Sequence, residues 1–285
     1  MAYTRQPAVA GQFYAGTRAA LEAEIKQCFR DRLGPGREPE VAAEGPRRIV
    51  GLVSPHAGYA YSGPIAAAAY GALGADGRPD TVVVISPQHR GWAPANTIQT
   101  AGAWRTPLGD MAVDGETAAG LAATAPWLED DPAPSADEHS LEVQLPFLQY
   151  VFGPELRFVP IMLGEQSLER ARSLGAVLAD CLLGKNAVIV ASTDLSHEHD
   201  ERHARAQDGK LIEALLRFDP EHYFETRTRL RATTCGFGPV TAMLCAARQL
   251  GAEQVEQLAY ATSADVVPGG GYVVGYVAAA VRRGP

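Results

Sequence analysis

Residues 49–56 read IVGLVSPH, a short apolar run that ends in Ser-Pro and is followed at once by a histidine. Such a run is typical of a buried strand, and Pro55 ends it because proline has no N–H to continue a ladder. His56 is therefore expected at the carboxyl end of a strand. A helix from Ser62 to about Leu73 should follow, since Pro64 suits a first turn and the alanines favour helix. Open α/β sheets bind their ligands at that edge.

The same pattern occurs twice more along the chain. Residues 81–89 read TVVVISPQH, so His89 also follows an apolar run that ends in Ser-Pro. Residues 187–197 read AVIVASTDLSH and carry Asp194 and His197 beyond a third run. Runs that are apolar at every position fit strands covered on both faces. If the three strands lie side by side and parallel, their histidines and the acid converge at one edge of the sheet.

Strand and helix patterns alternate along the whole chain, which predicts an α/β protein. We expect a single three-layer α/β/α domain over residues 1–285, with a mixed, largely parallel central sheet. Helices are expected at 17–33, 115–125, 168–183, 200–218, 220–230 and 236–250, and further strands at 157–163, 255–262 and 271–281. A hairpin or edge excursion is expected between 96–104 and 110–114. Residues 157–192 are typical of a β-α-β unit, which predicts parallel neighbouring strands with a right-handed crossover.

Composition excludes several classes of protein. The 285 residues carry a formal net charge of −8, so there is no overall basic field to hold nucleic acid or an anionic membrane. No apolar run approaches the roughly 20 residues of a spanning helix, and the first residues lack a signal-peptide pattern. The four cysteines include no CxxC pair, which favours reduced thiols. We therefore expect a cytoplasmic protein without nucleic-acid or membrane partners.

The two Ser-Pro histidines favour a metal site, because such a site requires ligands held on rigid elements. Two neutral imidazoles and one carboxylate leave open positions, the pattern of non-haem Fe(II) oxygenases, and Asp194 is a candidate for that carboxylate. Cys235 is the alternative third ligand, in the polar, Gly-rich turn TTCGFGP at residues 233–239. A thiolate there would favour zinc, copper or thiolate-ligated iron.

Asp194 and His197 are the candidate catalytic pair. Their spacing of three would place them on one side of a turn or nascent helix, where one could bind metal or orient a ligand while the other moves a proton. The alternative for Asp194 is a helix N-cap. His139 and Glu142 have the same spacing and could add a ligand or its partner, or form the polar first turn of a helix.

Several other side chains could contact a substrate. Tyr59 and Tyr61 flank the first histidine loop and could donate hydrogen bonds, or pack in the core with their hydroxyls satisfied. Arg90 follows the second histidine and could pair with an anion. With His139 and Glu142, these residues are the candidate substrate-binding set.

Five motifs in order resemble the Memo family: SPHAGYAYSG at 54–63, SPQH at 86–89, EHSLE at 138–142, STDLSH at 192–197 and TCG at 234–236. The chain is similar in particular to the bacterial AmmeMemoRadiSam system protein B, over nearly its whole length. The family's second motif often has two adjacent histidines, and Arg90 takes the place of the second one here.

The resemblance implies a fold like that of LigB-type class III extradiol dioxygenases, whose Fe(II) is held by two histidines and a carboxylate. By motif, His56 and His89 match the family's metal-binding histidines, and Cys235 matches its site cysteine. Asp194 and His197 match further site residues, His197 standing where the dioxygenases hold their proton-transfer histidine.

The function implied is that of a metal-binding, dioxygenase-like protein with redox or oxygenase activity on an unknown small molecule or peptide. Non-haem Fe(II) is the expected cofactor, with copper or zinc as alternatives. The resemblance also implies a pathway with radical-SAM and AMMECR-type partner proteins. The competing hypothesis is a non-catalytic peptide- or protein-binding module that uses a vestigial dioxygenase pocket, as some relatives are thought to do with phosphorylated peptides.

Overall fold

A mixed sheet forms the middle layer of the protein. The structure is a computed structural model that describes residues 3–43, 47–90 and 95–284. The strands of the main sheet are β2 (Ile49–Ser54), β3 (Thr81–Pro87), β4 (Asn96–Ile98), β7 (Glu129–Asp130), β8 (Arg157–Leu163), β9 (Ala187–Ser192), β10 (His197–Glu198), β11 (Gln254–Thr262) and β12 (Val273–Arg282). Their order is β10-β12-β2-β9-β3-β8-β4-β7, and β11 also pairs with β12. A small second sheet joins β1 (Thr4–Arg5), β5 (Ala103–Thr106) and β6 (Gly109–Ala112).

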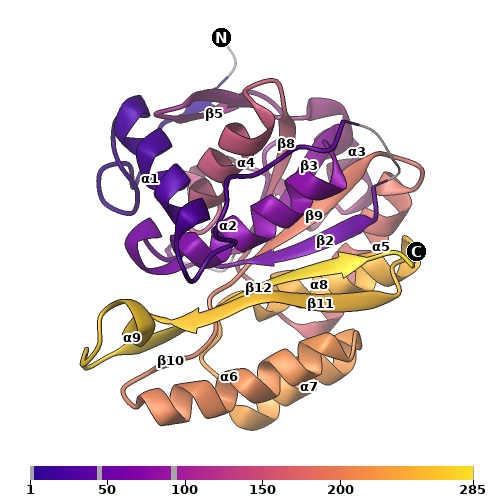
Figure 1. Cartoon of the computed structure of the whole chain (residues 1–285). Helices are drawn as coiled ribbons and strands as arrows, with labels where there is room; N and C mark the ends of the chain where they lie inside the picture. Colours follow the sequence, from indigo (N-terminus) through magenta and orange to yellow (C-terminus); the bar gives the residue numbers. More distant parts are fainter. Residues whose placement is uncertain (1–2, 44–46, 91–94, 285) are drawn as a thin grey trace.

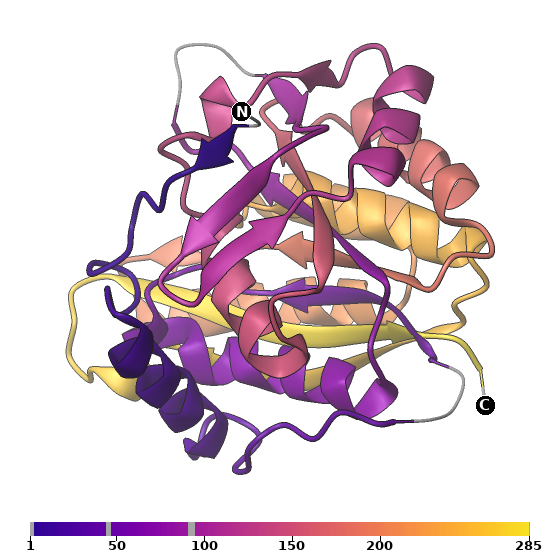
Figure 2. The ribbon, with the colours of Figure 1, turned by 90° about the horizontal axis from the view of Figure 1, so that it is seen from above.

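Helices cover both faces of the main sheet (Figures 1 and 2). They are α1 (Arg18–Arg30), α2 (Tyr59–Asp76), α3 (Gly115–Thr124), α4 (Leu145–Phe152), α5 (Leu168–Leu182), α6 (Glu201–Leu216), α7 (Pro220–Leu230), α8 (Phe237–Gln249) and α9 (Ser263–Val266), with 3-10 turns η1 (Ala133–Ser135) and η2 (Glu142–Gln144). Helices α1 and α2 lie on one face, and α5 and α8 lie on the other. The predicted three-layer α/β/α fold with a mixed, largely parallel sheet is confirmed.

The three apolar runs occupy the centre of the sheet. Strand β9 lies between β2 and β3 and runs parallel to both, with Ser54 opposite Ser192 and Ile85 opposite Ala191. Every residue of β2 and β3 is buried, as expected for strands covered by helices on both faces. The carboxyl ends of these strands therefore deliver the three motif loops to one edge, as the sequence predicts.

The structure corrects two predictions about this region. Strands β8 and β9 are parallel but not neighbours, because β3 lies between them and pairs with both. A β-α-β pattern specifies direction and handedness but leaves open which strand fills the space between. The segment after Asp194 is not a nascent helix: Leu195 N–H donates to Gly275 O, which ties it to β12, and α6 begins only after its N-cap Asp200.

Two further boundaries differ from the prediction. Helix α2 begins at Tyr59, one turn earlier than expected, so Pro64 lies inside it. The excursion after β3 splits: β4 joins the main sheet, and only β5 and β6 form the hairpin. Within the parts of the chain that the structure describes, no helix is both long and apolar enough to cross a bilayer.

Candidate metal centre

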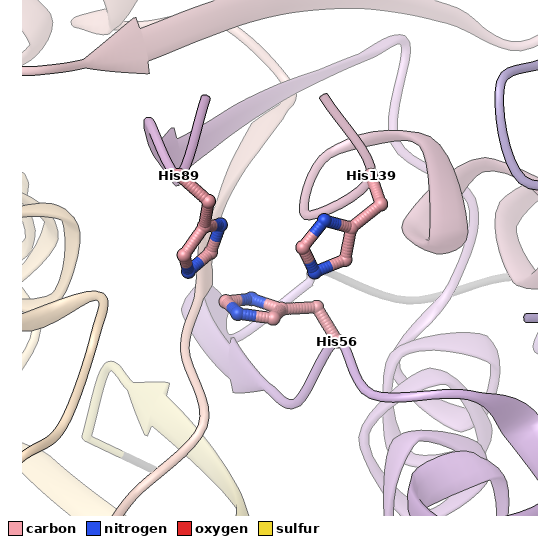
Figure 3. A group of neighbouring side chains, drawn as sticks. All are labelled: His56, His89 and His139. Carbon is pink, nitrogen blue, oxygen red and sulfur yellow. The ribbon is translucent and has the colours of Figure 1, made fainter. Parts of the chain in front are cut away.

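Three imidazoles converge at the carboxyl edge of the sheet. His56 follows β2, His89 follows β3, and His139 lies between η1 and η2. One ring nitrogen from each lies within 4.8 Å of the other two, and the ring centroids are 4.9–5.5 Å apart. Figure 3 shows the three rings directed toward one another. Side-chain exposure rises from 2% at His56 through 16% at His139 to 31% at His89, so the group opens to solvent on the His89 side.

Hydrogen bonds determine which nitrogen of His56 carries its proton. The Ser192 hydroxyl donates to Ser140 O (2.7 Å) and accepts from Gln144 Nε2 (2.9 Å). A serine hydroxyl has a single proton, so its 2.8 Å contact with His56 Nδ1 must be donated by the ring. Nε2 of His56 therefore keeps its lone pair.

Glu138 has the same effect on the other two rings. Its carboxylate is buried and lies 3.1 Å from His89 Nδ1 and 3.2 Å from His139 Nδ1. Burial alone would raise the pKa of Glu138, but hydrogen bonds from His139 and His89 and the Ser140 amide outweigh it and hold that pKa well below its usual value. As an anion it favours a proton on each Nδ1, so Nε2 is the nitrogen of each ring that remains available to a metal. This is the carboxylate–histidine pairing that orients metal ligands.

The electrostatics of His56 favour a neutral ring. Burial lowers the pKa of His56 well below its ordinary value, and the neighbouring His89 and His139 lower it further, because a charge on one ring disfavours a second charge beside it. Neutral imidazoles with bare Nε2 atoms are suitable ligands for first-row transition metals. The donor set therefore fits a bound divalent ion.

Cys235 and Asp194 lie next to His56, one of the three imidazoles. The thiol Sγ lies 3.1 Å from His56 Nε2. Asp194 Oδ2 lies 4.0 Å from the same nitrogen, and Asp194 Oδ1 accepts the His56 backbone N–H. Burial raises the pKa of both groups, which favours their protonated forms. Among the described residues, the set of mutually close donors contains the imidazoles but neither of these two side chains.

His197 lies beside the imidazole group without joining it. Its Nδ1 is 3.0 Å from Leu195 O and 3.2 Å from Thr233 O, so this nitrogen carries a proton. Strand β10 fixes its backbone by pairing with β12. Its ring lies near that of the exposed Tyr272, with the centroids 6.3 Å apart.

The predicted substrate-binding residues separate into different environments. Tyr59 is buried and donates to Val143 O (2.6 Å), which is the core alternative. Tyr61 and Arg90 are exposed. His139 faces the other imidazoles and is therefore a candidate ligand itself.

Glu142 does not face the imidazoles. It is fully buried and accepts hydrogen bonds from the N-terminal segment, including an ion pair with Arg5. The sequence motifs assign no role to Arg5, and Glu138 appears in them only as the first residue of EHSLE. The EHS sequence could have indicated Glu138, because a carboxylate next to a candidate ligand is a natural partner for it.

The TCG motif requires its glycine for packing. A Cβ on Gly236 would lie 2.2 Å from Ser192 O, at the end of β9. We expect Gly236→Ala to lower the free energy of unfolding by about 1–3 kcal/mol, because the backbone must move to relieve the overlap. Urea denaturation measures this. The control is Gly209→Ala in α6, where nothing lies within 4 Å and the change should stabilise the helix by about 0.5–1 kcal/mol. Equal effects of the two variants would contradict the close approach.

Glu138 should make stability depend on pH. Its folded-state pKa is depressed, so its stabilisation is present above the unfolded-state value of about 4.3 and is lost as the pH falls toward the folded-state pKa. We expect Glu138→Gln to cost about 1.5–3 kcal/mol at pH 6, the range for hydrogen bonds to a charged group. The difference from the unmodified protein should shrink below pH 4. Denaturant titrations at both pH values test this, and a constant difference would contradict it.

Comparisons with known proteins match nearly the whole chain to one family. A family model described as Memo-like protein matches residues 5–280. A MEMO1 family protein of Methanopyrus kandleri is 44% identical over 282 residues, covering 98% of this chain and 99% of the relative. MEMO1 family proteins of Methanothermobacter thermautotrophicus and Nitrosopumilus maritimus are 41% and 39% identical, covering 95% of this chain and 98% and 97% of the relatives.

Proposed function

This chain belongs to the Memo family, and on that premise we propose that it binds a redox-active metal ion in a dioxygenase-like site. The observation that carries the proposal is the convergence of three imidazoles whose Nδ1 atoms are all engaged. The proposal includes a relationship to LigB-type class III extradiol dioxygenases and to the bacterial AmmeMemoRadiSam system protein B. Both rest on the sequence motifs.

The residues that would hold the ion are His56, His89 and His139, through their Nε2 atoms. Cys235 is the nearest further donor, and it would bind as a thiolate after losing its proton. Iron(II) held by neutral imidazoles with open positions supplies redox and oxygen chemistry. The thiol beside His56 also suits copper or zinc, so the choice among the three metals is part of the test.

Two neighbouring side chains, His197 and Asp194, would hold or transfer protons at the site. His197 has its Nδ1 committed to backbone carbonyls, so Nε2 is the atom that would accept or release a proton. Asp194 is held by the His56 N–H, and its raised pKa favours holding a proton on its carboxyl. The burial of His56 excludes bulk water from the inner side of the site.

Metal analysis tests the proposal. Protein purified without added metal, and protein loaded with iron(II) under anaerobic conditions, should each contain a single tightly held ion per chain. The double variant His56→Ala, His89→Ala should contain none, whereas His203→Ala, exposed on α6, and His222→Ala, half-buried on α7, should leave the content unchanged. Equal metal content in all proteins would contradict a site at the imidazoles. Oxygen uptake with a panel of catechols and candidate peptides then tests for oxygenase activity.

A second candidate function is peptide or protein binding at the same edge of the sheet. Exposed Arg90 follows His89 directly and could pair with an anionic group on a partner. Radical-SAM and AMMECR-type proteins are the proposed pathway partners, and the four free cysteines fit a cytoplasmic setting for them. Full partner binding by the metal-free double variant would favour this function, and binding that requires the ion would favour the first.

A further inference from the structure

Arg5 is a buried cation whose side-chain hydrogen bonds all go to residues 135–142. It is 1% exposed and its guanidinium lies over the Trp104 ring, 4.3 Å from the ring centre. Arg5 Nε donates to Ser135 O (3.1 Å) and Nη2 donates to Glu138 O (2.7 Å). Nη1 forms the ion pair with Glu142. The planar guanidinium therefore bonds two carbonyl oxygens and one carboxylate within residues 135–142.

These eight residues carry the least regular part of the metal site. His139 and its partner Glu138 lie between the 3-10 turns η1 and η2, with no strand or helix to hold them. The His56 and His89 loops, by contrast, follow the central strands β2 and β3 directly. The orientation of His139 must therefore depend on contacts made by side chains from elsewhere in the chain.

The N-terminal segment is itself anchored. Strand β1 pairs with β5, which places Arg5 opposite Trp104. Ala8 and Val9 donate their backbone N–H groups to the Glu142 carboxylate. The backbone of Arg5 is thus fixed by the pairing of β1 with β5, and its partner Glu142 is fixed by the N–H groups of Ala8 and Val9. The guanidinium can therefore hold residues 135–142 in one position.

We propose that Arg5 is a positioning residue of the metal site, fixing the segment that turns His139 and Glu138 toward His56 and His89. The inference rests on the proposed function, because it assigns a role in metal binding. It requires arginine specifically, because a lysine ammonium lacks the planar fork that serves both carbonyls and the carboxylate at once.

Arg5→Lys is the informative variant, since it keeps a cation beside Glu142 but cannot reproduce the fork. We expect the metal dissociation constant, measured by competition with a chelator, to rise about 10–100-fold, as for other residues that orient a ligand. The matched control is Tyr14→Phe, which removes a 2.5 Å donor from Glu142 but leaves Ser135 O and Glu138 O bonded. It should bind metal as the unmodified protein does. Equal loss in both variants would overturn the proposal.

A thermodynamic cycle separates positioning from general weakening. If Arg5 acts mainly through His139, Arg5→Lys should weaken metal binding much more in the unmodified protein than in a His139→Ala background, where only its effect through Glu138 on His89 remains. Additive losses would mean that Arg5 acts on the whole fold, and the proposal would be wrong.

Hydrogen exchange tests the same role without any metal. In the metal-free protein, Arg5→Lys should speed amide exchange at Glu138, His139 and Ser140 and leave the amides of β2 and β9 unchanged. Unchanged exchange at residues 138–140 would overturn the proposal on its own. If the unmodified protein binds no metal while this local exchange still speeds up, the proposed function fails and the structural role of Arg5 stands. Should Arg5→Lys not fold, the variant that combines Arg5→Met with Glu142→Gln removes both charges together and takes its place.

Discussion

Alanine at position 139 is expected to lower the affinity for a divalent metal by more than about 100-fold, because removing a direct ligand should exceed the 10–100-fold cost of losing a residue that orients one. His139 supplies one of three bare Nε2 atoms that lie within 4.8 Å of one another. Without it two imidazoles remain, and Glu138 loses a donor that helps keep it ionised.

Competition with a chromogenic chelator measures this affinity, and the absorption spectrum of the cobalt-loaded protein reports the number of ligands. His203→Ala is the matched control, because its ring is on the exposed side of α6 and contacts Gln207. Undiminished affinity in His139→Ala would assign the third position to Cys235 or Asp194, both of which contact His56. A change in the spectrum alone would not be sufficient to support a direct ligand.

The sequence predicts those parts of the site that are attached to regular strands. The runs before His56 and His89 are apolar at nearly every position, which indicates buried parallel strands, and Ser-Pro marks where each strand ends. Parallel strands present their carboxyl ends at one edge, so local patterns alone predict that these two histidines lie at the same edge of the sheet. The place of β3 between β8 and β9 does not follow, because strand order depends on packing between distant segments.

His139 shows where this reasoning stops. Its motif fits the polar first turn of a helix as well as a ligand, and no local pattern decides between them. The decision is made by Glu138, which contacts both His139 and the ring of His89, 49 residues before it, and by Arg5, which holds the segment from 133 residues away. Such contacts have no period in the sequence. The family resemblance likewise indicated Cys235 and left His139 as one of several substrate-side candidates.

Long-range contacts also explain why spacing predicts a substrate-binding role for Glu142 that the structure does not support. The partners of Glu142 are distant in the sequence, so no local pattern indicates them. A glutamate three residues after a candidate ligand resembles a second functional group when only spacing is known. In the folded chain its two oxygens bind Arg5, the N–H groups of Ala8 and Val9, and the Tyr14 hydroxyl. Its role is therefore to fasten the N-terminal segment onto the loop that carries His139.

Glu142→Ala should accordingly be among the most destabilising single changes in the protein, lowering the free energy of unfolding by about 3–5 kcal/mol. It leaves the Arg5 guanidinium buried without its counter-charge and removes the acceptor of two backbone N–H groups. Urea denaturation measures the loss. Glu22→Ala is the control, because Glu22 pairs with Arg18 on the exposed face of α1 and should cost at most about 0.5 kcal/mol.

The cost of leaving the Arg5 charge unpaired can be measured separately from the cost of removing the Glu142 side chain. Adding Arg5→Met to Glu142→Ala removes the unpaired cation, so the double variant should lose less stability than the sum of the two single changes. Losses that simply add would mean that the two side chains contribute independently, as separate packing groups. A Glu142→Ala loss no larger than that of Glu22→Ala would mean that the N-terminal segment is held by the β1–β5 pairing alone, and the loop bearing His139 would then need another support.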